Sequence, residues 1–264
     1  MRILTLPGYT QNAIILSKRM GALRKTCGKN IEFVFVDPPH IVLNPSFGGT
    51  LADFDSSATT SKGEMTPETT PRSWWEVEPD KKENFVGYDE AVRYLRDFIE
   101  KDEKGFDGVM GFSQGAGMAA LLCSLINKPS VHPLFSTSKI NPFKFAIFVG
   151  GFVPNAKNLG LEKYFPIDGN TATLHIIGKV DVIISEARSL ALADNCEDSR
   201  VEYHDGGHFV PSKASYRNFF RDYISSFEEG GSQGDVPSPV SATPTPVSGR
   251  SAAGSPEPTP APKR

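Results

Sequence analysis

The sequence has few cysteines, no long apolar run and no strong charge imbalance. Its three cysteines, Cys27, Cys123 and Cys196, are odd in number, widely spaced and fit no zinc pattern, which favours a reduced, intracellular protein. No stretch approaches the roughly 18 apolar residues of a membrane-spanning helix. The apolar run at the N-terminus is too short for a signal peptide. We therefore expect no membrane span and a cytoplasmic location, with the nucleus as a second compartment.

The charge pattern argues against a polyanionic partner. The formal net charge is −3, and no Lys/Arg-rich run precedes the end of the chain. Proteins that bind nucleic acid usually carry a basic patch or stripe. We therefore expect no nucleic-acid partner.

Composition divides the 264 residues into a body and a tail. Residues 1–229 have an ordinary globular composition and are enough for one α/β domain. Residues 230–264 are mostly Gly, Ser, Pro, Thr and Ala, with almost no large apolar side chains. Such a segment cannot bury enough surface to offset its ordering entropy, so we predict a disordered tail.

Short apolar runs alternate with amphipathic stretches along the body. Runs that end at turn residues predict strands at 3–6, 31–36, 105–111, 145–149, 173–177 and 200–204. Helical spacing predicts helices at 12–27, 88–101, 116–126, 185–194 and 212–227, the last with Ser212 as a candidate cap. This alternation predicts an α/β fold with a mainly parallel sheet and helices on both faces.

Residues 44–84 interrupt the alternation. The segment contains a polar Ser/Thr stretch and then the adjacent pair Trp74-Trp75. A long irregular segment inside a compact domain is often a lid or binding loop, although a solvent-exposed insertion is an equal alternative here. Two adjacent indoles are rarely left in water, so Trp74 and Trp75 are expected to pack in the core or line a pocket.

The stretch Gly111-Phe112-Ser113-Gln114-Gly115 has the Gly-x-Ser-x-Gly pattern and lies between a predicted strand and a predicted helix. Small neighbours let the helix approach the strand, and the turn presents the serine hydroxyl at the carboxyl end of the sheet. The five-residue pattern also occurs in ordinary glycine-rich turns, but this strand–turn–helix context favours catalysis. We therefore predict that Ser113 is the nucleophile of an α/β-hydrolase.

A serine nucleophile needs a histidine base, which in this fold comes late in the chain. The candidates are His40, His132, His175, His204 and His208. His40 precedes the serine, His132 follows it too soon in the chain, and His175 lies inside a predicted strand. His204 ends the last predicted strand, whereas His208 lies in the loop that follows that strand. We predict His208 as the base, with His204 as the weaker alternative.

The histidine in turn needs an orienting acid, which lies between serine and histidine in the chain. The candidates include Asp168, Asp181, Asp194 and Asp198. Asp181 follows a predicted strand and so belongs at the same sheet edge as the serine. A turn-forming aspartate that caps the next helix is the alternative interpretation. We predict Asp181 as the acid.

Two backbone N–H groups are expected to stabilise the oxyanion. One belongs to Gln114, directly after the serine. The other should come from the loop after the first strand, where Pro7 has no N–H to donate. Gly8 permits a sharp turn there, which makes the N–H of Tyr9 the predicted second donor.

Several motifs together resemble the family of serine hydrolases known as the FSH group, over roughly residues 1–227. They are LPGYTQN (6–12), VDPPH (36–40), RSWW (72–75), GFSQGA (111–116), GGF (150–152), GKVD (178–181) and GHFVP (207–211). The chain differs from the family pattern at Pro7, where the family usually has His, and at Ile184-Ser185, where it usually has Pro. The resemblance implies an esterase or thioesterase that uses the Ser113, Asp181 and His208 triad.

Three functions are compatible with this sequence. The first is a carboxylesterase that cleaves small-molecule acyl esters, and the second is a thioesterase that releases acyl or polyketide chains from an acyl carrier protein. The third is a non-catalytic binding protein on the same scaffold, which the intact Ser, Asp and His disfavour. The triad mechanism needs no cofactor and no metal. Trp74, Trp75 and Phe152 are the candidate lining of an apolar acyl pocket.

Overall fold

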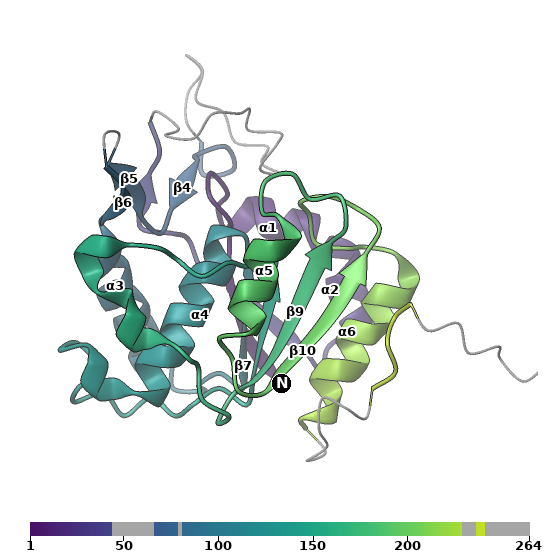
Figure 1. The fold of residues 1–264 in the computed structure, drawn as a ribbon. Coiled ribbons are helices and arrows are strands. Elements are labelled where there is room, and N and C mark those ends of the chain that lie inside the picture. Colours follow the sequence, from purple (N-terminus) through teal and green to yellow (C-terminus); the bar gives the residue numbers. More distant parts are fainter. Residues whose placement is uncertain (44–65, 79–80, 229–235, 241–264) are drawn as a thin grey trace, which may run out of the picture.

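The computed structural model describes residues 1–43, 66–78, 81–228 and 236–240 (Figure 1). A six-stranded, fully parallel sheet forms the centre. Its strands, in spatial order, are β10 (Ser199–His204), β9 (Ala172–Gly178), β8 (Phe145–Val149), β7 (Gly108–Phe112), β1 (Arg2–Leu6) and β2 (Glu32–Phe35). The predicted parallel sheet is therefore confirmed.

Within the described residues, no helix combines the length and apolar character that a bilayer crossing requires.

Helices cover both faces of the sheet, as the alternating pattern predicts. They are α1 (Ala13–Arg19), α2 (Gly21–Cys27), α3 (Tyr88–Lys101), α4 (Gln114–Asn127), α5 (Glu186–Ala193) and α6 (Ala214–Ser226). Short 3-10 turns follow at η2 (Pro129–Val131), η3 (Lys157–Leu159) and η4 (Leu161–Tyr164). Helices α1, α2 and α6 lie on one face, and α3, α4 and α5 lie on the other (Figure 1).

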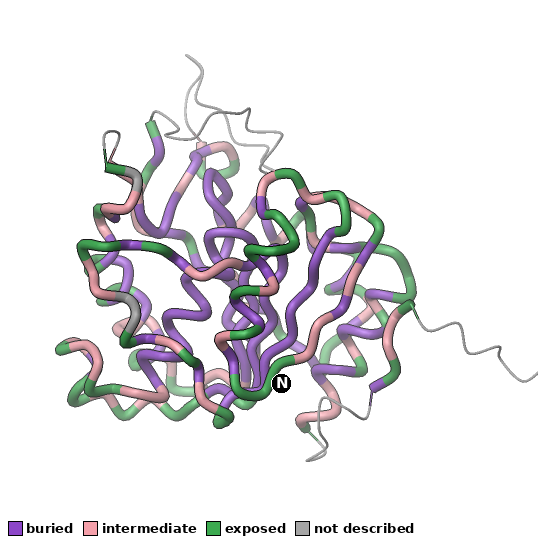
Figure 2. Tube along the Cα trace, in the orientation of Figure 1, coloured by how far each residue is buried: buried purple, intermediate pink, exposed green. Residues whose placement is uncertain are grey.

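The pleat of the strands divides the core between these two faces. On β8, Phe145 and Ile147 pack in the cluster that contains α6, whereas Ala146 and Phe148 pack in the cluster that contains α4. Alternate residues of a strand point to opposite faces, so a strand covered on both sides is apolar throughout. All five residues of β8 are buried, and the central strands are buried along their lengths (Figure 2).

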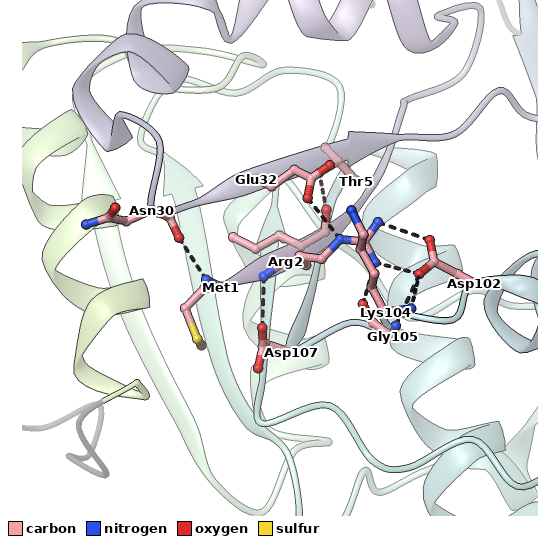
Figure 3. Close-up of polar contacts among 10 residues, drawn as sticks. Met1, Arg2, Thr5, Asn30, Glu32, Asp102, Lys104, Gly105 and Asp107 are labelled. Carbon is pink, nitrogen blue, oxygen red and sulfur yellow. Dashed lines mark hydrogen bonds and ion pairs between the residues drawn. The ribbon is translucent and has the colours of Figure 1, made fainter.

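An ion-pair network fixes the amino-terminal edge of the sheet. The Arg2 guanidinium binds both carboxylate oxygens of Asp102 at 2.6 and 3.0 Å and one oxygen of Glu32 at 2.9 Å, and its backbone N–H donates to Asp107 (Figure 3). The hydrogen bond from Arg2 is the main reason that the pKa of Asp102 lies below its usual value. The network ties β1 to β2 and to the turn before β7, at the edge opposite the strand ends that carry Ser113.

Two sequence-based helix predictions need correction. The expected single helix over 12–27 is divided at Met20, which ends α1 and precedes α2. The predicted cap at Ser212 is also wrong. Helix α6 begins at Ala214, so its N-cap residue is Lys213, and no side chain caps the helix. By contrast, the Asn12 side chain accepts the N–H of Ile15 and caps α1.

The predicted irregular segment also needs correction in its second half. Two short antiparallel pairs form there, β3 (His40–Ile41) with β4 (Arg72–Ser73), and β5 (Glu76–Glu78) with β6 (Lys81–Val86). Residues 44–65, which contain the polar Ser/Thr stretch, lie outside the described residues. The regular pairs place the tandem tryptophans on the body of the domain.

One short piece of the predicted disordered tail lies on the domain. Residues 236–240 are described, and Val236 is buried in the cluster that contains α6. The Ser238 hydroxyl donates to the Glu202 carboxylate on β10 at 2.6 Å. The tail prediction is therefore wrong for these five residues, and the rest of the tail lies outside the described residues.

Candidate active site

The carboxyl ends of the parallel strands bring the predicted site residues to one edge. Leu6 lies beside Gly111, and Phe112 lies beside Val149, in adjacent strands of the sheet. The loops that leave these ends hold Pro7 to Tyr9, Ser113 and Gly150 to Phe152. Strands β9 and β10 end at the same edge, and their loops hold Asp181 and His208. Five separate segments therefore converge where parallel α/β sheets bind ligands.

Ser113 occupies a strained turn between β7 and α4. Its φ and ψ are 54° and −118°, a conformation that costs a non-glycine residue of order 1–3 kcal/mol. Its N–H donates to the Val149 carbonyl at 2.9 Å, which anchors the turn to β8. A Cβ on Gly111 would lie 2.2 Å from the Gly115 carbonyl oxygen, and one on Gly115 would lie 2.1 Å from that of Leu6. Only glycine fits at both positions, which accounts for the two glycines of the motif.

Ser113, His208 and Asp181 form a continuous hydrogen-bonded chain. The Ser113 Oγ lies 2.8 Å from His208 Nε2, and His208 Nδ1 lies 2.7 Å from Asp181 Oδ2. The side chains of His208 and Asp181 are almost completely buried. The imidazole also packs on the Phe112 ring, with 4.8 Å between ring centroids. The three side chains therefore have the mutual geometry of an acid–base–nucleophile unit.

Asp181 is held in a single orientation by its own turn. Its Oδ1 accepts the backbone N–H groups of Ile183 and Ile184, each at 2.9 Å, which leaves Oδ2 for the histidine. Burial alone would raise the pKa of this carboxyl, but hydrogen bonding and charge attraction from His208, together with the two backbone donors, lower it overall. The group is therefore an anion near neutral pH and fixes a proton on His208 Nδ1.

The other histidines are placed away from this chain of hydrogen bonds. His204 Nδ1 accepts the Gly206 N–H, and its ring packs against Phe209. His175 is buried inside β9, and burial lowers its pKa to about 3, so it is neutral. His40 pairs with the Gly87 carbonyl, while His132 lies near Asp89 on the surface.

The loop after β1 lies directly against the serine. A Cβ on Gly8 would lie 3.2 Å from the Ser113 Cβ, so the loop backbone passes beside the nucleophile. The Gly8 N–H already donates to the Gln11 side chain, at 3.2 Å. Gln114 is the first residue of α4, where backbone N–H groups have no intrahelical acceptor. These contacts suit Gln114 and Tyr9 as oxyanion donors, an assignment that stays a prediction.

A cavity of about 600 Å³ opens beside Ser113. Its walls are mainly apolar and include Trp75, Phe85, Phe152, Val153, Ile183 and Ile184. Trp75 stacks on Phe85 with 4.8 Å between ring centroids. Two of the three predicted pocket residues, Trp75 and Phe152, thus line the cavity.

The prediction that Trp74 lines the pocket is wrong, because this residue is fully buried and is not among the described residues that line the cavity. Its indole N–H donates to the Pro7 carbonyl at 2.9 Å, and this hydrogen bond holds the loop after β1 in place. The tandem tryptophans therefore have different positions, one in the core and one in the cavity wall.

The side chain of Gln114 joins the serine turn to these tryptophans, a role that the sequence did not reveal. Its Oε1 accepts a hydrogen bond from the backbone N–H of Trp74 at 2.9 Å, and its Nε2 donates to the backbone carbonyl of Trp75 at 2.8 Å. Gln114 is buried, so neither backbone group has an easy alternative partner in water. The residue after the nucleophile therefore fixes the cavity wall through its side chain.

Replacing Gln114 with alanine should lower the free energy of unfolding by about 2–4 kcal/mol, because it strands a buried N–H and a buried C=O. Chemical denaturation of the Gln114→Ala variant measures this loss. Asn158 offers a matched control, since its amide makes the same pair of bonds to Phe85 but is solvent-exposed. Asn158→Ala should cost much less. Equal losses in the two variants would contradict the role given to burial at Gln114.

Two further features of the described residues bear on ligands. A hollow of about 670 Å³ lies near Phe106 and Phe143, at the amino-terminal edge of the sheet, and contains none of the three hydrogen-bonded site residues. The described residues contain no cluster of three His, Cys, Asp or Glu side chains that could hold a metal ion. Of these two cavities, only the one beside Ser113 is lined by a hydrogen-bonded site residue, so we consider it the candidate substrate pocket.

Sequence comparison places this geometry among known proteins. The family model described as "Serine hydrolase (FSH1)" matches residues 1–220. Esterase OVCA2 of Danio rerio is 32% identical over 241 residues, which cover 86% of this chain and 98% of that protein. A Schizosaccharomyces pombe protein named dihydrofolate reductase is 33% identical over 233 residues. That match covers 86% of this chain, but the chain spans only 47% of the yeast protein.

Structure comparison agrees on the fold. Acyl-protein thioesterase 2 of Zea mays superposes with a TM-score of 0.55, covering 85% of this chain and 92% of that one. The two sequences are 16% identical, so the likeness concerns the fold alone. The fold of this chain is that of the α/β-hydrolases.

Proposed function

The chain belongs to the FSH1 serine hydrolase family, and from this premise we propose that it hydrolyses carboxylic esters or thioesters through an acyl-enzyme on Ser113. The observation that carries the proposal is the hydrogen-bonded chain from Ser113 through His208 to Asp181, at 2.8 and 2.7 Å, beside an apolar cavity. Acyl chains suit such walls, and the serine hydroxyl lies at the cavity's edge.

The first half-reaction forms the acyl-enzyme. Ser113 Oγ attacks the carbonyl carbon while His208 Nε2 takes its proton, and Asp181 stabilises the resulting imidazolium. The N–H groups of Gln114 and Tyr9 hold the negative oxygen of the tetrahedral intermediate. When the intermediate collapses, His208 returns the proton to the departing alcohol or thiol.

The second half-reaction releases the acid. His208 takes a proton from water, whose oxygen attacks the acyl carbon and forms a second tetrahedral intermediate. Collapse of that intermediate expels Ser113 Oγ, which recovers the proton from the imidazolium. The sum consumes one ester or thioester and one water, and it yields one carboxylic acid and one alcohol or thiol.

A fluorophosphonate probe tests the nucleophile directly. We expect the wild-type protein to gain the mass of one probe on the peptide that contains Ser113, and the Ser113→Ala variant to gain none. Ser212→Ala removes an exposed serine outside the hydrogen-bonded chain and should label like the wild type. Undiminished labelling of Ser113→Ala would refute Ser113 as the nucleophile, and no labelling of the wild type would favour a non-catalytic binding protein.

Esters and thioesters differ only in the leaving group of this mechanism. Turnover of p-nitrophenyl octanoate and of octanoyl coenzyme A by the same preparation separates an esterase from a thioesterase. A higher kcat/KM for the thioester, and activity on an acyl carrier protein loaded with the same chain, would favour release of carrier-bound acyl groups.

A further inference from the structure

The cavity beside Ser113 contains one positive side chain. Among the described lining residues, Arg188 is the only cation and Glu83 the only anion. Arg188 is the third residue of α5, the helix that follows the Asp181 turn. Its guanidinium carbon lies 4.7 Å from the centroid of the Phe152 ring, which is itself part of the cavity wall. The charge therefore sits on an apolar wall of the pocket that is proposed to hold the acyl substrate.

The protein does not neutralise this charge within the described residues. Glu83, the other charged lining residue, forms an ion pair with Lys157. The charge of Asp181 acts on Arg188, but both oxygens of that carboxylate are occupied by His208 and by two backbone N–H groups. No ion pair to Arg188 is found in the part of the chain that the structure describes, and the one hydrogen bond of its guanidinium there is a long one, 3.5 Å to the Ile183 carbonyl.

The environment of Arg188 favours a bound anion. Arg188 is an exposed residue, although partial burial of its guanidinium lowers its pKa, an effect that the charge of Asp181 opposes. A guanidinium remains protonated at neutral pH. Contact with the face of the Phe152 ring holds the group at the cavity wall and uses none of its N–H donors. A planar guanidinium with unused donors binds a carboxylate or phosphate with two parallel hydrogen bonds.

We propose that Arg188 binds an anionic group of the substrate, so that the enzyme prefers acyl substrates that carry a negative charge in addition to an apolar chain. The anion is a carboxylate on the acyl chain or a phosphate on the leaving group. Both would place oxygen atoms against the guanidinium while the chain contacts Trp75 and Phe152. This inference rests on the proposed ester or thioester hydrolysis at Ser113.

Matched substrate pairs test the proposal. The carboxylate arm compares the mono-p-nitrophenyl ester of suberic acid with its neutral methyl ester counterpart. The phosphate arm compares octanoyl coenzyme A with the N-acetylcysteamine thioester of octanoate. We expect wild-type kcat/KM to favour the anionic member of at least one pair by about 10- to 100-fold, the range of a charge-assisted hydrogen bond.

Variants assign that preference to one side chain. Arg188→Gln should remove the preference by lowering kcat/KM for the anionic member much more than for the neutral member, and Arg188→Lys should keep part of it. Arg93→Gln removes the same charge from the exposed face of α3 and should change nothing. The arm in which the preference disappears identifies the source of the anion. A preference that survives in Arg188→Gln, or an equal fall for both members of each pair, would overturn the proposal.

Binding separates this inference from the proposed chemistry. In the Ser113→Ala background, calorimetry gives the affinity for both members of each pair without turnover. The anionic member should bind about 10- to 100-fold more tightly, and Arg188→Gln should abolish the difference. Equal affinities in the presence of Arg188 would refute the anion site, whereas failure of fluorophosphonate labelling would refute only the catalytic role of Ser113.

Discussion

An alanine at either Ser113 or His208 should lower kcat for ester hydrolysis by about 10⁶-fold, the loss seen when one member of a serine triad acts as part of a unit. The reason lies in the 2.8 Å hydrogen bond between the two side chains. Without the imidazole, no nearby group removes the serine proton, and without the hydroxyl, the imidazole has no nucleophile to activate.

The losses in the two single variants should not add. A Ser113→Ala, His208→Ala double variant should be no slower than either single variant, because either one alone already disables the unit. Initial rates with a p-nitrophenyl ester measure all three. His204→Asn is the control, since asparagine can still accept the Gly206 N–H that His204 accepts. A control variant as inactive as His208→Ala, or losses that multiply in the double variant, would contradict the assignment.

Chain order and strand ends were enough to predict which residues meet at the sheet edge. Ser113, Asp181 and His208 each follow a strand that the sequence identifies from its apolar run, and parallel strands bring those positions together. The glycine requirement at Gly111 is local, since its neighbour is Gly115, whereas the requirement at Gly115 arises where α4 approaches the distant end of β1. Their catalytic roles remain proposals that the variants test.

The residues that sequence reasoning missed depend on contacts between distant segments. The Gln114 side chain pairs with backbone groups about 40 positions earlier in the chain, in a segment expected to be irregular. Arg188 lies on an ordinary amphipathic helix, and only the packing of α5 beside Phe152 places it at the cavity. Neither residue has a local pattern that distinguishes it from a solvated polar side chain.

The tandem tryptophans illustrate the same limit. Composition correctly indicated that neither indole is left in water, since both are buried. It could not indicate that Trp74 would bond to Pro7 in the core while Trp75 would line the cavity, because the two residues lie in the bend between β4 and β5, where no strand periodicity sets the direction of a side chain. The side that faces the cavity is decided by the Gln114 hydrogen bonds and by Phe85, which come from other segments.

Replacing Asp181 with asparagine should lower kcat by about 10⁴-fold without unfolding the protein, as the equivalent exchange does in serine protease triads. The geometry gives the reason. Oδ1 of Asp181 accepts two backbone N–H groups, so the amide introduced by Asp181→Asn must place its carbonyl oxygen there and turn its NH₂ toward His208. His208 Nδ1 would then accept a hydrogen bond, and the proton would move to Nε2, where the imidazole cannot take one from Ser113.

The wrong tautomer of His208 can be distinguished experimentally from simple loss of a negative charge. Asp205→Asn provides the comparison, because it removes an exposed carboxylate that pairs with Lys179 in the same group of loops. That variant should retain nearly wild-type kcat. Asp181→Ala lacks the donor that imposes the wrong tautomer but also leaves two backbone N–H groups unpaired, so it should lose stability as well as activity. If Asp181→Asn instead kept most of its kcat, the acid would have to be sought among the other carboxylates, and the proton on His208 Nδ1 would need another acceptor.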